Sequence, residues 1–135
     1  MSGTAAKLLR LATVLWAGSL WALALWVAPT LFRISPDRHL AGLMAGSLFR
    51  IQSVLTVVLA LICLWRLGAG SARGLYLAAV MLITNELIIR WLMNIAKAKG
   101  PILRLGFGGW HGVSMVLYVI ACLGAVSAVW KDDFR

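Results

Sequence analysis

Acidic residues are scarce in this sequence. Of its 135 residues only four are Asp or Glu, whereas 13 are Lys or Arg, and the formal net charge is +9. The acidic residues are Asp37, Glu86, Asp132 and Asp133. A chain with so few of them and 62% hydrophobic residues could not cover its own apolar surface with polar groups in water. The composition therefore excludes an ordinary soluble domain.

Cysteines and enzyme signatures are sparse as well. Cys63 and Cys122 both lie in apolar runs, and no CxxC pair or Cys/His spacing typical of a metal site is present. We therefore interpret both thiols as small buried hydrophobic groups. The sequence also contains no P-loop, no GxSxG and no HExxH. These absences exclude the common motif-bearing classes of soluble enzyme.

Apolar residues dominate what is present. The mean hydropathy is +0.93, and a soluble domain is only about half apolar. The class is therefore integral membrane protein. The basic residues are scattered between apolar runs, which is typical of membrane-flanking anchors and not of a nucleic-acid-binding stripe. We expect the lipid bilayer as the surroundings of the chain and no nucleic acid as a partner.

Four apolar stretches approach or exceed the roughly 20 residues that a membrane helix needs. They are residues 11–32, 40–65, 75–96 and 107–130. The segments between them are short and carry charges, glycines and prolines, which are loop signals. Short loops favour antiparallel packing of neighbouring helices. The sequence thus predicts an all-α, integral membrane four-helix bundle with short loops, and residues 1–135 as a single transmembrane domain.

Four spans place both termini on one side of the membrane, which we call side A, and we call the opposite side B. Outside the spans, side A carries Lys7, Arg10, Arg66, Arg73, Lys131 and Arg135, and side B carries Arg33, Arg38, Lys97, Lys99 and Arg104. Basic residues accumulate in cytoplasmic loops, and side A has the small excess. We therefore expect a multi-pass membrane protein with cytoplasmic termini.

Two GxxxG pairs indicate where helices pack closely. They are Gly42 with Gly46, and Gly108 with Gly112. Small residues let the backbones of membrane helices approach one another. Gly124 with Ala128 continues a line of small residues in the fourth span. We expect packing within one chain, with Gly112 at a close contact between the fourth helix and another.

Charged and polar residues interrupt the third span. Glu86, Arg90 and Asn94 are spaced i, i+4, i+8 and form one stripe on a helix. Counting 1.5 Å per residue, Glu86 lies about 16 Å inside from side B. An unpaired arginine at the bilayer centre costs about 2.5 to 3.5 kcal/mol. We therefore expect Glu86 and Arg90 to pair and to face the bundle.

The stripe has two interpretations. It can be a structural pair that fixes helix register while Arg50 of the second span reaches the headgroups. It can also belong to a polar pocket that binds or transports a ligand, because ionisable residues inside a membrane are candidates for function. The residues of this predicted polar cluster are Arg50, Glu86, Arg90, Asn94, His111 and Ser114.

His111 also has two interpretations. Histidine is a common ligand of metals and haem, and His39 lies on the same side of the membrane. No third or fourth ligand with diagnostic spacing is present. We expect His111 to be held by hydrogen bonds, with Ser114, Asn94 or Glu86 as partners, and no cofactor. A haem site at His111 stays open as the alternative.

Four phrases together suggest a family. They are WAGSLW (16–21), APTLF (28–32), LAGLMAGSLFR (40–50) and FGGWHGVSMVLY (107–118). This set resembles the small four-pass bacterial family of unknown function whose eukaryotic relatives include transmembrane protein 205. The resemblance covers nearly the whole chain, and its most specific part is the HG-x-S element at His111, Gly112 and Ser114. It implies a four-helix membrane protein with no established catalytic activity.

We therefore expect a small four-span membrane protein of uncharacterised activity. The main hypothesis is a non-enzymatic role in transport, permeation or assembly that uses the polar cluster. Candidate partners are a second copy of the chain or another membrane protein. The alternative hypothesis is a haem- or metal-binding membrane redox protein that uses His111.

Overall fold

The computed structural model describes residues 3–130, and this part of the chain is almost entirely helical. Its elements are α1 (Gly3–Ala22), the π-helix η1 (Leu23–Val27), α2 (Ala28–Ile34), α3 (Arg38–Leu67), α4 (Arg73–Thr84), the π-helix η2 (Asn85–Ile89), α5 (Arg90–Lys99) and α6 (Phe107–Trp130). They join into four continuous rods, and each rod is long and apolar enough to cross a membrane. The predicted all-α bundle of four membrane helices is confirmed.

The first three rods are longer than the apolar stretches predicted from the sequence, whereas the fourth has the predicted bounds. The first covers residues 3–34, the second 38–67 and the third 73–99. The extra turns contain basic residues, which lower hydropathy but are compatible with a helix. At the start of α3 the Asp37 carboxylate accepts a hydrogen bond of 2.8 Å from the backbone N–H of His39, so this helix begins at a capped end.

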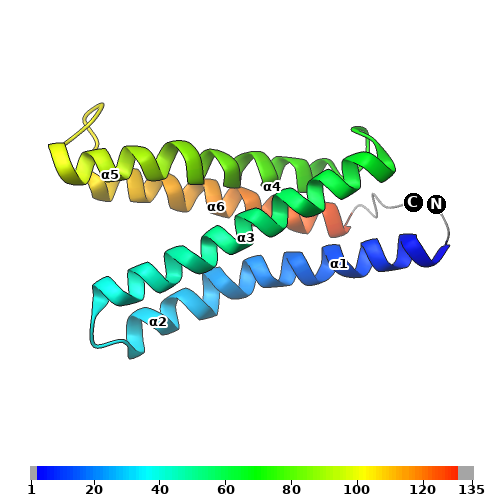
Figure 1. The fold of residues 1–135 in the computed structure, drawn as a ribbon, viewed down its shortest axis with the longest axis horizontal. Coiled ribbons are helices and arrows are strands. Elements are labelled where there is room, and N and C mark those ends of the chain that lie inside the picture. The colour runs from blue at the N-terminus through cyan, green and yellow to red at the C-terminus, as the bar shows by residue number, and fades with distance from the viewer. Residues whose placement is uncertain (1–2, 131–135) are drawn as a thin grey trace.

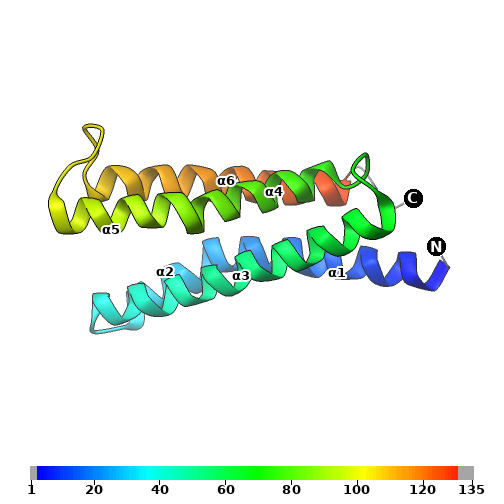
Figure 2. The ribbon, with the colours of Figure 1, turned by 45° about the horizontal axis from the view of Figure 1, so that its top comes forward.

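The four rods form two pairs (Figure 1). One pair is α1–η1–α2 with α3, and the other is α4–η2–α5 with α6. The first rod begins and the fourth ends at the same end of the molecule, which is side A. The two pairs diverge toward side B in both ribbon views (Figure 2). There α2 packs on α3, while α5 packs on α6.

Helix packing is tightest between α4 and α6. A Cβ atom built on Gly124 would lie 2.7 Å from the carbonyl oxygen of Gly74, and one built on Gly74 would lie 2.8 Å from the backbone nitrogen of Ala128. Real Cβ atoms do not approach this closely, so both glycines are required by the contact. Around it lies the main core, which includes the fully buried Leu75 and Leu82.

Two π-helices interrupt the rods. In η1 the backbone N–H of Ala28 bonds to the carbonyl of Leu23, and the next residue, Pro29, has no N–H to donate. In η2 the N–H of Arg90 bonds to the carbonyl of Asn85. Each π-turn adds one residue to a turn of helix, and such turns are frequent at functional sites. η2 contains Glu86, so this interruption coincides with the charged stripe.

Candidate binding site on side B

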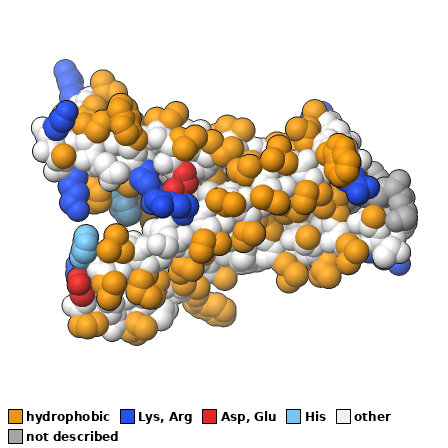
Figure 3. Space-filling view, in the orientation of Figure 1, with side chains coloured by type: hydrophobic (Ala, Val, Ile, Leu, Met, Phe, Trp, Pro, Cys, Tyr) orange, Lys and Arg blue, Asp and Glu red, His pale blue; other side chains and the backbone are white. Residues whose placement is uncertain are grey.

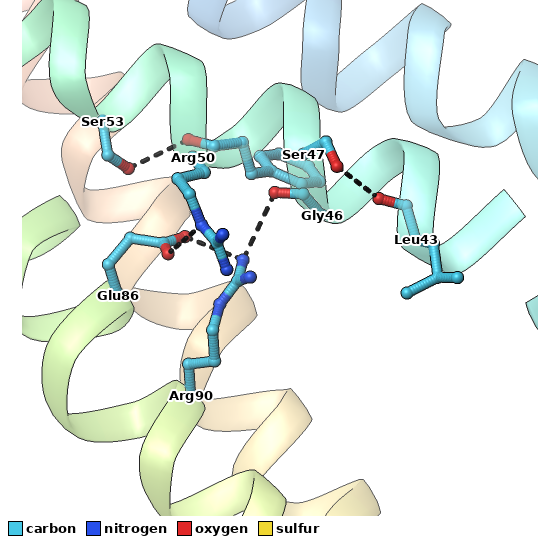
Figure 4. Close-up of polar contacts among 8 residues, drawn as sticks. Leu43, Gly46, Ser47, Arg50, Ser53, Glu86 and Arg90 are labelled. Carbon is cyan, nitrogen blue, oxygen red and sulfur yellow. Dashed lines mark hydrogen bonds and ion pairs between the residues drawn. The ribbon is translucent and has the colours of Figure 1, made fainter. Parts of the chain in front are cut away.

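Glu86 lies between two arginines. Its Oε1 accepts a hydrogen bond of 2.9 Å from Nη2 of Arg90, one turn further along the same rod. Its Oε2 lies 3.7 Å from Nε of Arg50 on α3. Figure 4 shows the two guanidinium groups approaching this one carboxylate from neighbouring helices. The expected ion pair of Glu86 with Arg90 is therefore present, and the expected approach of Arg50 is present as well.

Arg90 also connects the third rod to the backbone of α3. Its Nη2 donates a second hydrogen bond of 3.3 Å to the carbonyl oxygen of Gly46. A Cβ atom on Gly46 would lie 3.8 Å from that same nitrogen, which is ordinary contact. Gly46 therefore faces the arginine and not the backbone of another helix. Gly42, one turn earlier, has only the Phe32 ring within 4 Å of a built Cβ. This pair of glycines lines a space and does not form a tight helix crossing.

The three charged residues lie at the inner end of a hollow. The space-filling view shows an opening at the side-B end between the α2–α3 pair and the α5–α6 pair (Figure 3). Lys/Arg and acidic side chains meet at its inner end, and histidine side chains lie on both of its walls. We call this hollow, with Arg50, Glu86 and Arg90 at its inner end, the side-B cleft.

The three side chains differ in burial. The Glu86 side chain is 15% exposed and that of Arg90 is 28% exposed, whereas that of Arg50 is 65% exposed. Arg50 follows the start of α3 by twelve residues, which corresponds to about 18 Å along a helix. A largely exposed guanidinium thus lies well inside a rod that is long enough to span a membrane.

The structure does not bring the remaining predicted cluster residues to this carboxylate. Asn94 is exposed, and Ser114 is half-buried. His111 is exposed, and its ring stacks on Phe107 with the centroids 6.2 Å apart and an interplanar angle of 13°. Within residues 3–130 neither Asn94, His111 nor Ser114 makes a side-chain hydrogen bond. The prediction of a hydrogen-bonded His111 was wrong, because the side chain points to the exposed surface of α6 beside Phe107.

The prediction of a close contact at Gly112 was also wrong. Nothing lies within 4 Å of a Cβ atom built on Gly112 or on Gly108, and both residues are exposed. The side of α6 that packs on α4 carries Gly124 and Ala128, the small residues that follow the predicted pair. Gly74 was not predicted as a packing residue because it forms no GxxxG pair, although the small residue Ala78 lies four residues after it.

A second polar group was missed by the sequence reasoning. The Trp16 indole Nε1 donates a hydrogen bond of 2.7 Å to Oγ1 of Thr56, and both residues are buried. Nearby, the Ser19 hydroxyl and the Gln52 side chain exchange hydrogen bonds of 2.9 and 3.2 Å. These contacts join α1 to α3. Gln52 follows Arg50 by two residues and therefore lies on nearly the opposite face of the helix, which is the signal that could have separated the two groups.

A metal site has little support from side-chain grouping. In the part of the chain that the structure describes, no group of three or more His, Cys, Asp or Glu residues could hold a metal ion. Lys97 lies 6.0 Å from the centroid of the Phe107 ring, which also stacks on His111. The surroundings of His111 are thus an aromatic ring and a cation at the side-B end of α5 and α6.

Together, the four apolar rods identify a multi-pass membrane protein with charged residues inside its helical part. The chain belongs to the family described as a domain of unknown function (DUF4149), whose family model matches residues 11–99. The match includes most of α1 and continues through α5, so it contains Arg50, Glu86 and Arg90 but not α6. Neither a curated protein nor a solved structure matches the chain.

Proposed function

We propose that this protein is a non-enzymatic membrane protein that binds a membrane-resident ligand in the side-B cleft, in a transport, permeation or assembly role. The observation that carries the proposal is the shared carboxylate: Arg50 and Arg90 both approach Glu86, and Arg50 keeps 65% of its side chain exposed. Ionisable groups inside a membrane are costly unless they are paired or used. Arg90 is paired, whereas Arg50 is only partly so.

The chemistry of the three groups favours binding over catalysis. A guanidinium is always charged and has no lone pair to act as a base, but it presents up to five donors to an anion. Both carboxylate oxygens of Glu86 already face arginines, at 2.9 and 3.7 Å. The cluster is therefore suited to holding an anion and not to moving a proton.

The proposal includes a location. Basic residues outside the predicted spans number six on side A and five on side B, so the positive-inside rule favours cytoplasmic termini. We propose the bacterial inner membrane, with the side-B cleft opening away from the cytoplasm. We also propose kinship with the family of transmembrane protein 205, on the strength of the phrase FGGWHGVSMVLY (107–118).

The test is whether water reaches the cleft. Gly42 is exposed on the face that leads to Gly46, and a Cβ atom there has ordinary room. Met44 is exposed at nearly the same depth but lies about 200° away around the helix. We expect a membrane-impermeant maleimide to label Gly42→Cys from side B in intact membranes and to leave Met44→Cys unlabelled.

The native thiols give little background because Cys63 and Cys122 are 0% and 2% exposed. Arg38→Cys, at the exposed start of α3, serves as a reference for full labelling from side B. If Arg38→Cys is labelled and Gly42→Cys reacts no faster than Met44→Cys, the cleft is closed to water and the proposed function is wrong.

A further inference from the structure

The charges at the inner end of the side-B cleft do not balance. Two guanidinium groups, those of Arg50 and Arg90, meet the single carboxylate of Glu86. Arg90 makes two hydrogen bonds, at 2.9 and 3.3 Å. Among residues 3–130, Arg50 has only its Nε near Glu86, at 3.7 Å, and its two terminal nitrogens make no hydrogen bond. The cluster therefore carries one positive charge that no group in the described chain neutralises.

This charge lies well inside a helix that is long enough to span a membrane. Arg50 is about 18 Å along α3 from the side-B end of the helix. An arginine at the centre of a membrane helix costs about 2.5 to 3.5 kcal/mol on the insertion scale, and a partner anion reduces that cost. A mobile anion that resides in the membrane would meet the need.

Within residues 3–130 no further carboxylate is available as the anion. Glu86 is already shared by two arginines, and Asp37 caps the first turn of α3 in the side-B loop. The other acidic residues, Asp132 and Asp133, lie outside both the predicted spans and the described residues. A second copy would bring the same set and the same excess of positive charge. The partner is therefore a molecule of another kind.

The surroundings of Arg50 are those of an amphiphile. Leu43 and Val54 lie seven residues before and four residues after Arg50, on nearly the same face of α3, and they are 57% and 58% exposed. Leu87, which follows Glu86, is 70% exposed. A guanidinium flanked by exposed aliphatic groups matches a molecule with an anionic head and hydrocarbon tails. Guanidinium and phosphate also pair through two parallel hydrogen bonds.

The side-B end of α5 carries further positive charge. Lys97 of α5 lies over the Phe107 ring, and His111 stacks on the same ring. An anionic head that enters from side B would pass from this cation to the arginines at the inner end. The exposed aliphatic side chains would contact its tails.

We propose that the side-B cleft binds an anionic phospholipid, with the phosphate on the terminal nitrogens of Arg50 and within reach of Arg90. This inference rests on the proposed function and names its ligand class. The head group supplies the negative charge that the cluster lacks, and the tails extend along exposed apolar side chains of α3 and η2.

The experiment compares two lipids on the purified, delipidated protein in neutral detergent. Phosphatidylglycerol carries a net negative charge, and phosphatidylcholine of the same acyl chains does not. We expect phosphatidylglycerol to raise the melting temperature at lower concentrations than phosphatidylcholine and to stay bound in native mass spectra. Arg50→Gln should weaken phosphatidylglycerol binding about tenfold, because it removes charge-assisted hydrogen bonds.

Arg66→Gln is the matched control. Arg66 is also exposed on α3, but it lies at the side-A end, where its guanidinium is 4.7 Å from the centroid of the Trp65 ring. Its replacement should leave phosphatidylglycerol binding unchanged. Arg50→Lys keeps the charge but loses the two-pronged geometry, so it should restore part of the affinity.

Three results would overturn the proposal. One is equal affinity for the two lipids in the wild-type protein, which needs no variant to fold. Another is that inorganic phosphate displaces the lipid and raises the melting temperature by the same amount. The cleft would then be a site for a free anion. The third is loss of a co-purifying membrane protein in Arg50→Gln with no change in lipid binding. In each case, labelling of Gly42→Cys would still support a ligand-binding cleft, so the two proposals fail separately.

Discussion

Gly74 of α4 and Gly124 of α6 lie against each other so closely that neither position has room for a side chain. A Cβ atom on Gly124 would lie 2.7 Å from the Gly74 carbonyl oxygen. That neighbour is backbone, so it cannot turn aside as a flexible side chain would. We expect Gly124→Ala to lower the free energy of unfolding by about 1 to 3 kcal/mol, as overpacking of a well-packed core does. Thermal unfolding in detergent measures the loss.

Gly112→Ala is the control for this prediction. Nothing lies within 4 Å of a Cβ atom at Gly112, on the same helix. Alanine is also the better helix former of the two residues, so the change should be neutral or slightly stabilising. A larger loss at Gly112 than at Gly124 would contradict the helix contact described here.

Removal of the Glu86 carboxylate alone should lower the free energy of unfolding more than removal of both Glu86 and Arg90. Glu86→Leu leaves Arg90 with only the Gly46 carbonyl and Arg50 with no carboxylate among the described residues. Breaking a fully buried pair costs about 3 to 5 kcal/mol, and the partial exposure here reduces the expected loss to roughly 2 kcal/mol. The double variant Glu86→Leu, Arg90→Leu also removes one of the two cations left unpaired, so its loss in free energy of unfolding should be smaller. Equal melting temperatures of the two variants would mean that the pair contributes little.

Thr56→Val tests the buried contact between α1 and α3. The change keeps the shape of the side chain but leaves the Trp16 indole N–H, which now donates at 2.7 Å, without its acceptor. A buried donor left unsatisfied costs about 1 to 3 kcal/mol. The control is Ser47→Ala on the same helix, where the exposed hydroxyl bonds only to the Leu43 carbonyl. That change should stay within about 0.5 kcal/mol.

The haem alternative has a direct optical test. The His111 ring is stacked on Phe107 with the centroids 6.2 Å apart, and Nζ of Lys97 lies 6.0 Å from the centroid of the same Phe107 ring. We expect His111→Ala to leave the absorbance spectrum of the purified protein unchanged, with no Soret band in either form. A Soret band in the wild type that disappears in His111→Ala would favour the redox hypothesis.

The pairing of Glu86 with Arg90 could be predicted because it depends only on a separation of four residues along one helix. The approach of Arg50 could be predicted from cost, since an isolated guanidinium in the membrane needs a carboxylate and only one lies within the spans. Both follow from local spacing or from scarcity, and both can be read without knowing how the helices are rotated.

The surroundings of His111 and the exposure of Gly112 could not be predicted in the same way. Which face of α6 packs depends on its rotation, and a helix with small residues along much of its length has several faces that would permit close contact. The Gly74 contact selects the face with Gly124 and Ala128, and Gly108 and Gly112 remain outside this contact. The sequence pattern offered candidates for this choice, but only the partner helix decides between them.

The π-turn η2 is the place where the third rod can lose a residue and keep its direction. A π-turn holds one residue more than a regular turn, so loss of one residue within Asn85–Ile89 would restore regular winding with the turns on either side still in register. In a regular part of the rod the same loss would rotate everything beyond it by about 100°. A relative with a single-residue gap inside η2 would therefore keep both Gly74 against Gly124 and Arg90 facing the Gly46 carbonyl, whereas a gap elsewhere between Gly74 and Arg90 would separate the two contacts.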